Sequence, residues 1–139
     1  RGLKTLDVRV RRCNENAERV AEWCAARPEI RKVHYAGLPD HPDHALAKKL
    51  LDGFGGLMSI ELVGGVEAAD RFTRKLRMIS HASSLGGVDT LVVEPRYSSH
   101  AHMTSDERAR IGIPDGFLRL SIGIENFEDI IADIAQALQ

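Results

Sequence analysis

The sequence predicts an α+β sandwich within the broad α/β class, in which helices cover one face of a small, mainly antiparallel sheet. Segments with helical spacing of apolar residues alternate with short β-like segments along the chain. Several β-like segments have one apolar and one polar face, whereas strands of a parallel sheet buried on both faces are apolar throughout. A length of 139 residues suits one folding unit, so we predict a single domain over residues 1–139.

Four main helices are expected, over residues 2–26, 42–51, 66–78 and 127–138. The first, third and fourth segments have the three-and-four spacing of apolar residues that is typical of amphipathic helices. Pro28 ends the first helix, Asp40 or His41 lies near the cap of the second, and Asn126 caps the last. Thr104 opens one or two further helical turns, with acidic residues at the positive end of the helix dipole.

Short β-like segments lie between these helices, over residues 32–36, 57–63, 79–82, 90–94 and 116–123. Alternation along the last segment places Leu118, Leu120 and Ile122 on one face and Arg119 on the other. The planar fork of guanidinium donors in such a position suits a carboxylate, because two parallel charge-assisted hydrogen bonds fix its direction. From the strand alone, a solvated or salt-bridged arginine is the alternative interpretation.

Composition narrows the classes of partner. Lys plus Arg (19) nearly balances Asp plus Glu (20), so no global field attracts nucleic acid or an anionic membrane. No apolar run approaches the ~20 residues of a membrane span, and the first residues lack a secretory pattern, so we expect a cytoplasmic protein. Cys13 and Cys24 share the first helix about 16 Å apart, which is too far for a disulfide bond.

The chain also resembles a known family along its whole length. Between Ser83 and Glu125 it reads SSLGGVDTLVVEPRYSSHAHMTSDERARIGIPDGFLRLSIGIE. Further matching segments lie at residues 1–6, 14–17, 35–39 with His41 and His44, and 53–56. Together, in this order, they resemble the C-terminal domain of the cysteine and methionine metabolism (transsulfuration) family of pyridoxal-phosphate enzymes. That family includes cystathionine synthases and lyases, methionine lyases and homoserine-ester sulfhydrylases.

The resemblance implies a substrate-binding site. Arg119 matches the arginine that holds the substrate α-carboxylate in the family, and Ser84 matches a serine near that carboxylate and the cofactor-bearing lysine. Ser83 occupies the preceding position, which tunes substrate choice and is often glutamate in cystathionine-handling members. Ser99, followed by His100, matches a hydroxyl residue that supports the arginine. The resemblance therefore implies that Arg119, Ser84, Ser83 and Ser99 contact or support the substrate.

The same resemblance implies partners that this segment does not supply. In the family, pyridoxal 5'-phosphate is held by a lysine, a partner for the pyridine nitrogen and a phosphate cup in the N-terminal portion and a neighbouring subunit. None of the five lysines here lies in a Ser-x-Thr-Lys segment. We therefore expect a C-terminal domain without a catalytic or cofactor-binding residue of its own, inactive alone and part of a homotetramer when joined to its cofactor domain.

Other interpretations of the sequence compete with this one. His41 with His44, and His100 with His102, invite a metal site, but companion ligands at established spacing are missing, so none is expected. Residues 53–56 are glycine-rich yet precede a strand, which favours close backbone packing over phosphate binding. Two other classes of function stay open: a free-standing amino-acid-binding domain, and an oligomerisation module without catalysis.

Overall fold

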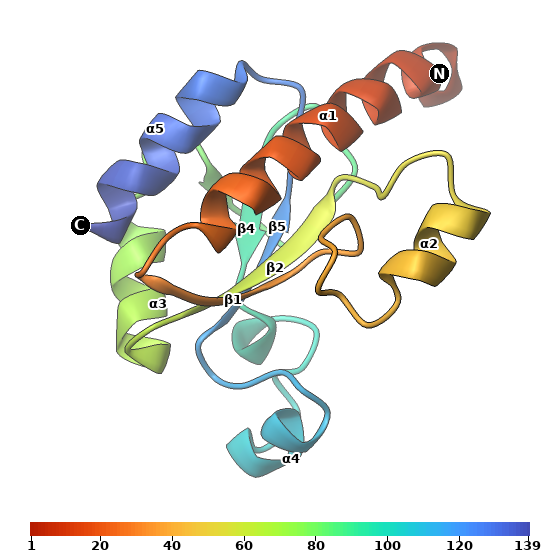
Figure 1. Cartoon of the computed structure of the whole chain (residues 1–139). Helices are drawn as coiled ribbons and strands as arrows, with labels where there is room; N and C mark the ends of the chain where they lie inside the picture. Colours follow the sequence, from red (N-terminus) through yellow and green to blue (C-terminus); the bar gives the residue numbers. More distant parts are fainter.

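The computed structural model describes residues 1–139, and the chain folds into five α-helices and five strands (Figure 1). The helices are α1 (Leu6–Ala25), α2 (His44–Leu50), α3 (Gly65–Lys75), α4 (Ser105–Arg110) and α5 (Phe127–Leu138). The strands are β1 (Ile30–His34), β2 (Leu57–Leu62), β3 (Ser80–His81), β4 (Leu91–Val93) and β5 (Phe117–Ser121). Two short 3-10 helices, Gly2–Thr5 and Pro95–Tyr97, precede α1 and follow β4.

The five strands form one sheet in the order β1-β2-β5-β4-β3. All neighbouring pairs are antiparallel except β3 with β4, which run parallel. The central strand β5 is registered so that Arg119 pairs with Ser59 of β2 and with Val93 of β4. The predicted mainly antiparallel sheet is therefore confirmed.

Helices α1, α3 and α5 lie together against one face of the sheet (Figure 1). The strands direct every second side chain toward these helices, and those side chains are almost wholly buried. They include Met58, Ile60, Leu118, Leu120 and Ile122. Because burying one such aliphatic or thioether side chain contributes about 1.5–3 kcal/mol, this layer is the main source of stability.

The opposite face of the sheet carries polar and aromatic side chains that stay partly exposed. Glu61 of β2 pairs with His34 of β1 at 2.6 Å, and the His34 ring packs against Phe117 of β5. Ser59 and Arg119 lie farther along the same face. The two-faced pattern of the strands is what the sequence predicted, with Arg119 on the polar side.

The structure corrects three helix boundaries. Helix α1 begins at Leu6 and not at residue 2, because residues 2–5 form a separate 3-10 helix. Helix α2 begins at His44 with Asp43 as its N-cap residue, so the expected start at residue 42, capped by Asp40 or His41, was wrong. Helix α3 ends at Lys75 and not at Met78. The early end of α3 reflects a contact with α5. The carboxylate of Asp133 on α5 accepts hydrogen bonds from the backbone N–H groups of Arg77, Met78 and Ile79 at 2.8–2.9 Å.

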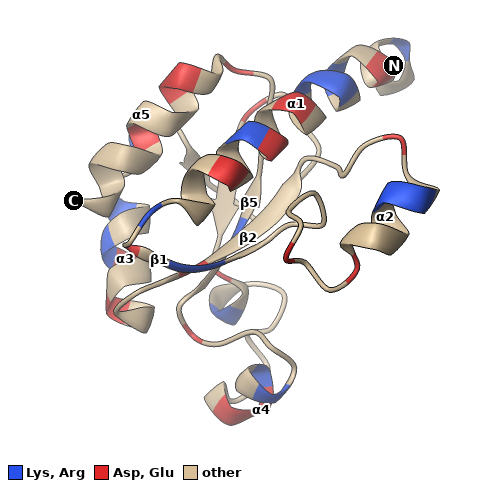
Figure 2. Ribbon diagram, viewed as in Figure 1, with Lys and Arg blue, Asp and Glu red and all other residues tan.

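The N-terminal caps of α4 and α5 agree with the sequence. Asn126 caps α5 by accepting from the N–H of Glu128 at 3.2 Å. Thr104 and Glu107 form a reciprocal capping box on α4. Charges of both signs alternate along the outer surface of α1, whereas basic residues gather near the end of α3 (Figure 2). Cys13 and Cys24 are free, buried thiols, and no helix combines the length and hydropathy needed to cross a bilayer.

Candidate functional site

Arg119 lies on β5, the central strand of the sheet. Its neighbours in β5, Leu118 and Leu120, are fully buried against the helices, and pairing with β2 and β4 fixes the backbone on both sides. Alternation then directs the Arg119 side chain to the polar face. The guanidinium thus extends from a central strand and not from a mobile segment, which is how a binding group is best positioned.

The loop that links β3 to β4 folds over this guanidinium. Arg119 donates from Nη2 to the backbone carbonyls of Ser83 and Ser84, at 3.3 and 3.0 Å. The loop is held a second time by the backbone N–H of Gly86, which donates to Ser121 Oγ at 3.0 Å. Gly86 has φ +73°, a left-handed conformation that favours glycine. Ser83 and Ser84 are therefore adjacent to Arg119, although through their backbones.

The remaining donors of Arg119 are not used within the chain. No carboxylate lies within salt-bridge distance of the guanidinium, and Nη1 has no hydrogen-bond partner. Nε is buried and also lacks a partner. Backbone carbonyls do not neutralise the positive charge, so the group keeps its preference for an anion. The arrangement suits recognition of a carboxylate that approaches from outside the chain.

The hydroxyl of Ser99 lies apart from this arrangement. Its Oγ forms a 2.8 Å hydrogen bond with Nδ1 of the neighbouring His100, and none with Arg119. The loop that carries it is held by Arg108, which donates to the carbonyls of His100 and Met103 and pairs with Asp115. The structure thus brings Arg119, Ser83 and Ser84 together but does not join Ser99 to them. A supporting role for Ser99 stays a prediction.

A cavity of about 230 Å³ opens beside the same loop, and the sequence did not predict it. Leu85 and Gly86 of the loop and Ser121 and Ile122 of β5 line one side. The N-terminal half of α1 and residues 55–57 line the other, including Cys13. Burial, and secondarily the nearby Glu125, raise the pKa of the Cys13 thiol, so it is a neutral wall residue at physiological pH.

Glycines allow the segment of residues 53–56 to approach α1 closely. A Cβ at Gly56 would lie 3.1 Å from Cys13 Cβ and 3.2 Å from the Ile122 carbonyl, and one at Gly53 would lie 2.2 Å from Asn14 Nδ2. The glycine cluster therefore serves close backbone packing, as its position before a strand indicated. The spacing of Cys13 and Asn14 on the helix gave no signal that they would meet these glycines.

The histidines that invited a metal interpretation do not converge. His41 accepts a hydrogen bond at Nδ1 from the N–H of Asp43, and His44 donates from Nδ1 to the Ala36 carbonyl at 2.8 Å while stacking on Phe54. No group of three or more His, Cys, Asp or Glu side chains is placed to hold a metal ion. These histidines order the turn before α2 and the glycine-rich segment.

The lysines likewise lie away from the site. All five are exposed, and none lines the cavity beside Arg119. They are Lys4, Lys32, Lys48, Lys49 and Lys75. The residues that line this cavity include no lysine, and the neighbouring Arg119 offers a guanidinium whose geometry suits a carboxylate.

Comparison with known proteins places this geometry in context. All 139 residues match the family described as Cys/Met metabolism PLP-dependent enzyme. The chain is 45% identical to L-methionine gamma-lyase from Fusobacterium nucleatum subsp. polymorphum over 139 residues, and 42% identical to cystathionine beta-lyase from Coxiella burnetii over 138. Its fold matches cystathionine gamma synthase from Xanthomonas oryzae pv. oryzae with a TM-score of 0.93 at 47% identity.

In each case the match involves nearly the whole of this chain but a minor part of the relative. The chain covers 35% and 36% of the two lyases, and the structural match covers 99% of this chain and 35% of the synthase. The predicted family and the predicted α/β fold are therefore both confirmed. The chain belongs to the Cys/Met metabolism PLP-dependent enzyme family.

Proposed function

We propose that this chain is the C-terminal, substrate-carboxylate-binding domain of a pyridoxal-phosphate enzyme that acts on amino acids derived from homoserine or cysteine. The reaction is a β- or γ-elimination or a γ-replacement. The observation that carries the proposal is Arg119, a guanidinium fixed on a central strand that has no carboxylate partner and keeps Nη1 free. The similar identities to lyases and a synthase leave the choice among these reactions open.

Arg119 acts by orientation. A substrate α-carboxylate accepts from the guanidinium, and the planar fork fixes its direction as well as its position. With the carboxylate fixed, rotation about the bond to Cα is restricted, and the Cα proton is presented to a base in one geometry. The loop at Ser83 and Ser84 adjusts to admit the carboxylate, because its carbonyls occupy Nη2 in the substrate-free chain.

Pyridoxal phosphate supplies the electron sink for the negative charge that develops at Cα. No lysine lines the cavity next to the loop of residues 83–86, and all five lysines are exposed, which supports a cofactor site formed by other residues. We place the Schiff-base lysine and the phosphate-binding groups outside these 139 residues. The isolated chain then has no turnover.

Exposed apolar side chains near the start of α1 support the presence of a partner domain. Leu6 and Val10 of α1, and Leu3 of the preceding 3-10 helix, continue the apolar stripe beyond the sheet, and all three are exposed. We propose that the domain bearing the cofactor lysine covers this stripe, and that the complete protein assembles as a homotetramer. The cavity beside Leu85 then lies at the junction of the two domains.

The role of Arg119 is tested in the longer protein that contains this chain and its cofactor. Arg119→Lys should raise KM for amino-acid substrates about tenfold, because the bidentate fork is lost, and Arg119→Gln about a hundredfold. Arg31→Gln, at an exposed position on an edge strand, is the matched control. Unchanged kinetics in Arg119→Gln would rule the proposal out, provided the cofactor absorbance is retained.

The chain alone offers a second test. Purified chain mixed with pyridoxal phosphate should release no α-keto acid from cystathionine, methionine or an acyl-homoserine. Calorimetric titration with the same amino acids separates the alternatives: binding without turnover through the free Nη1 of Arg119 favours a free-standing amino-acid-binding domain. Reversible assembly without binding favours an oligomerisation module. Keto acid release contradicts all of these assignments.

A further inference from the structure

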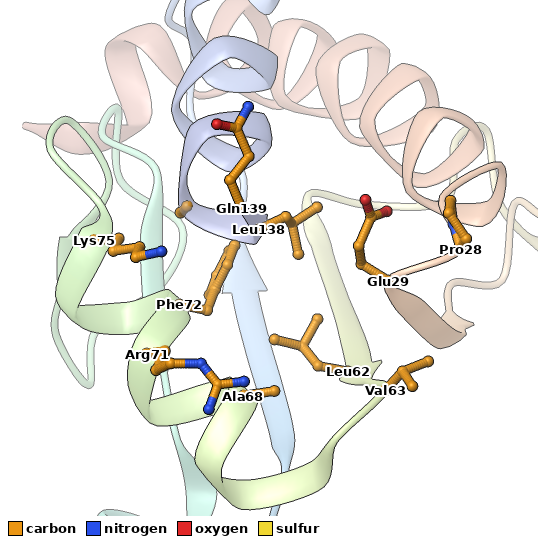
Figure 3. Close-up of a pocket in the computed structure, with 11 residues that line it drawn as sticks. Pro28, Glu29, Leu62, Val63, Ala68, Arg71, Phe72, Lys75, Leu138 and Gln139 are labelled. Atoms are coloured by element: carbon orange, nitrogen blue, oxygen red, sulfur yellow. The ribbon is translucent and has the colours of Figure 1, made fainter.

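A second cavity, distinct from the Arg119 site, lies where the ends of several elements meet. It has a volume of about 360 Å³, which suits a small ligand. Its floor is apolar and preformed, because Leu62, Phe72 and Ala137 are each less than 5% exposed. Leu138 at the end of α5 and Val63 at the end of β2 extend the apolar lining. Figure 3 shows Leu62, Val63, Phe72 and Leu138 around the cavity.

Two cations from α3 form one side of this cavity. Arg71 and Lys75 lie four residues apart on the helix, so they stand on the same face, one turn from each other. In Figure 3 both extend from α3 toward the apolar floor. Neither forms a salt bridge anywhere in the chain.

Both cations are exposed to solvent and neither has a salt-bridge partner within the chain. Like charges at this spacing repel each other and slightly destabilise a helix. The helix dipole favours a cation in the last turn, which accounts for Arg74 and Lys75 but not for Arg71, one turn earlier. An anion between Arg71 and Lys75 would remove the repulsion, and the adjacent apolar floor would strengthen the attraction by excluding water on one side.

The opposite side of the cavity carries one acidic side chain. Glu29 lies across the apolar floor from Arg71 and Lys75 (Figure 3). Its backbone carbonyl accepts from the N–H of Val63 at 2.9 Å, which fixes this wall to the end of β2. A carboxylate at this place disfavours a second negative charge on the ligand. The charges therefore select an anionic group at one end of the ligand only.

We propose that the cavity between α3, α5 and the end of β2 binds a small monocarboxylate with a short aliphatic body. The carboxylate lies between Arg71 and Lys75, and the aliphatic body covers Phe72, Leu62 and Leu138. This site is separate from Arg119, which is registered with Ser59, three residues before Leu62 along β2. The proposal does not depend on the function proposed for Arg119.

The test is an NMR titration of the ¹⁵N-labelled chain with 4-methylpentanoate, using the neutral isostere 4-methylpentanamide as the control ligand. We expect saturable shifts at residues 62–63, 68–75 and 137–139 with the carboxylate only. Arg71→Gln or Lys75→Gln should each raise Kd about three- to tenfold. Ala68→Leu, which fills part of the cavity, should abolish the shifts.

Arg74→Gln is the matched control, because it removes the same charge from the same helix but Arg74 does not line this cavity. Its Kd should stay within about twofold of the unsubstituted chain. The proposal is overturned by an absence of saturable shifts up to about 20 mM, by equal shifts with the amide, or by equal weakening in Arg74→Gln. Shifts confined to Arg119 and residues 83–87 also overturn it while supporting the other site.

A further outcome would show that a second copy of the chain, and not a small ligand, covers the cavity. If sedimentation equilibrium shows that the chain self-associates and the resonances of residues 68–75 change with protein concentration, a second copy covers the cavity. That result overturns the ligand proposal.

Discussion

Arg96, Arg108 and Arg119 all lie at least partly buried, but their partners differ. Arg96 pairs with Asp70 and Glu94, and Arg108 pairs with Asp115, so each of these charges is neutralised inside the chain. Arg119 contacts only backbone carbonyls. A partly buried cation without a counter-ion raises the free energy of the folded chain unless a bound anion neutralises it. The difference supports the binding role proposed for Arg119, whereas the charges of Arg96 and Arg108 are already paired within the chain.

Asp133 is the buried carboxylate whose loss should be most costly. Burial would raise its pKa, but hydrogen bonds from three backbone N–H groups, and from Gln136, outweigh burial and lower the pKa below its usual range. We predict that Asp133→Asn lowers the free energy of unfolding by about 2 kcal/mol at pH 7, because the amide NH₂ opposes N–H donors. Urea denaturation measures this, with exposed Glu22→Gln as a control that changes stability by less than about 0.5 kcal/mol.

The stability difference between the unsubstituted chain and Asp133→Asn should depend on pH, because folding lowers the pKa of Asp133. A carboxyl group with a lowered folded-state pKa stabilises the protein above its unfolded-state pKa, near 3.8, and loses that contribution as pH falls through the folded-state value. The difference in stability between the unsubstituted chain and Asp133→Asn should therefore be constant above about pH 5 and shrink at lower pH. A difference that grows on acidification would contradict the assignment.

At the scale of helices and strands, the pattern of residues within one segment predicted which face of that segment is buried. The apolar spacing along α1 and α5 and the alternation along β5 correspond to buried faces in the structure. The end of α3 was missed because Asp133, more than fifty residues away in sequence, binds the N–H groups that would have continued the helix turn. Contacts between distant segments leave no periodic signal in either segment.

The same distinction applies to the candidate site. The face on which Arg119 lies follows from alternation in one strand. That Ser83 and Ser84 lie near the same substrate was implied only by family resemblance. Their contact with Arg119 is made by backbone carbonyls, which residue types do not reveal. The cavity beside Leu85 joins α1, two loops and β5, so no single segment of sequence contains it.

The turn after β5 is joined to β4 and α1 by a buried network centred on Thr90. Thr90 Oγ1 donates to Glu125 Oε2 at 2.8 Å and accepts from the N–H of Gly123 at 2.9 Å. Asn16 of α1 donates to the carbonyls of Gly123 and Glu125. Because these bonds connect three elements, the network fixes α1 to the strand that carries Arg119.

We predict that Thr90→Val, which is close to isosteric, lowers the free energy of unfolding by about 1–3 kcal/mol, since it leaves the Gly123 N–H and a Glu125 oxygen without partners. Thr90→Ser keeps the hydroxyl and should retain most of the stability. Urea denaturation compares the variants, and amide hydrogen exchange at Gly123 should accelerate in Thr90→Val only. Equal losses in both variants would show that the methyl group and not the hydroxyl matters.

At the scale of the whole molecule, α1 divides into two halves with different surroundings. Its buried residues begin at Cys13, whereas every residue before Arg9 is exposed. Yet the apolar stripe that starts at Leu3 runs without interruption into the packed half. An amphipathic helix buries its stripe against something. The exposed first half of α1 is therefore the surface that the domain proposed above would cover.

This surface separates the stability of the chain from that of the assembled protein. Leu3→Glu with Val10→Glu should change the free energy of unfolding of the isolated chain by less than about 1 kcal/mol, because both side chains are already exposed. In the longer protein the same pair should weaken domain packing and lower the thermal midpoint by several degrees. Ile111→Glu, exposed on the distant α4 segment, is the control and should leave both values unchanged. A large loss in the isolated chain would show instead that the stripe packs within these 139 residues, and the need for a covering domain would disappear.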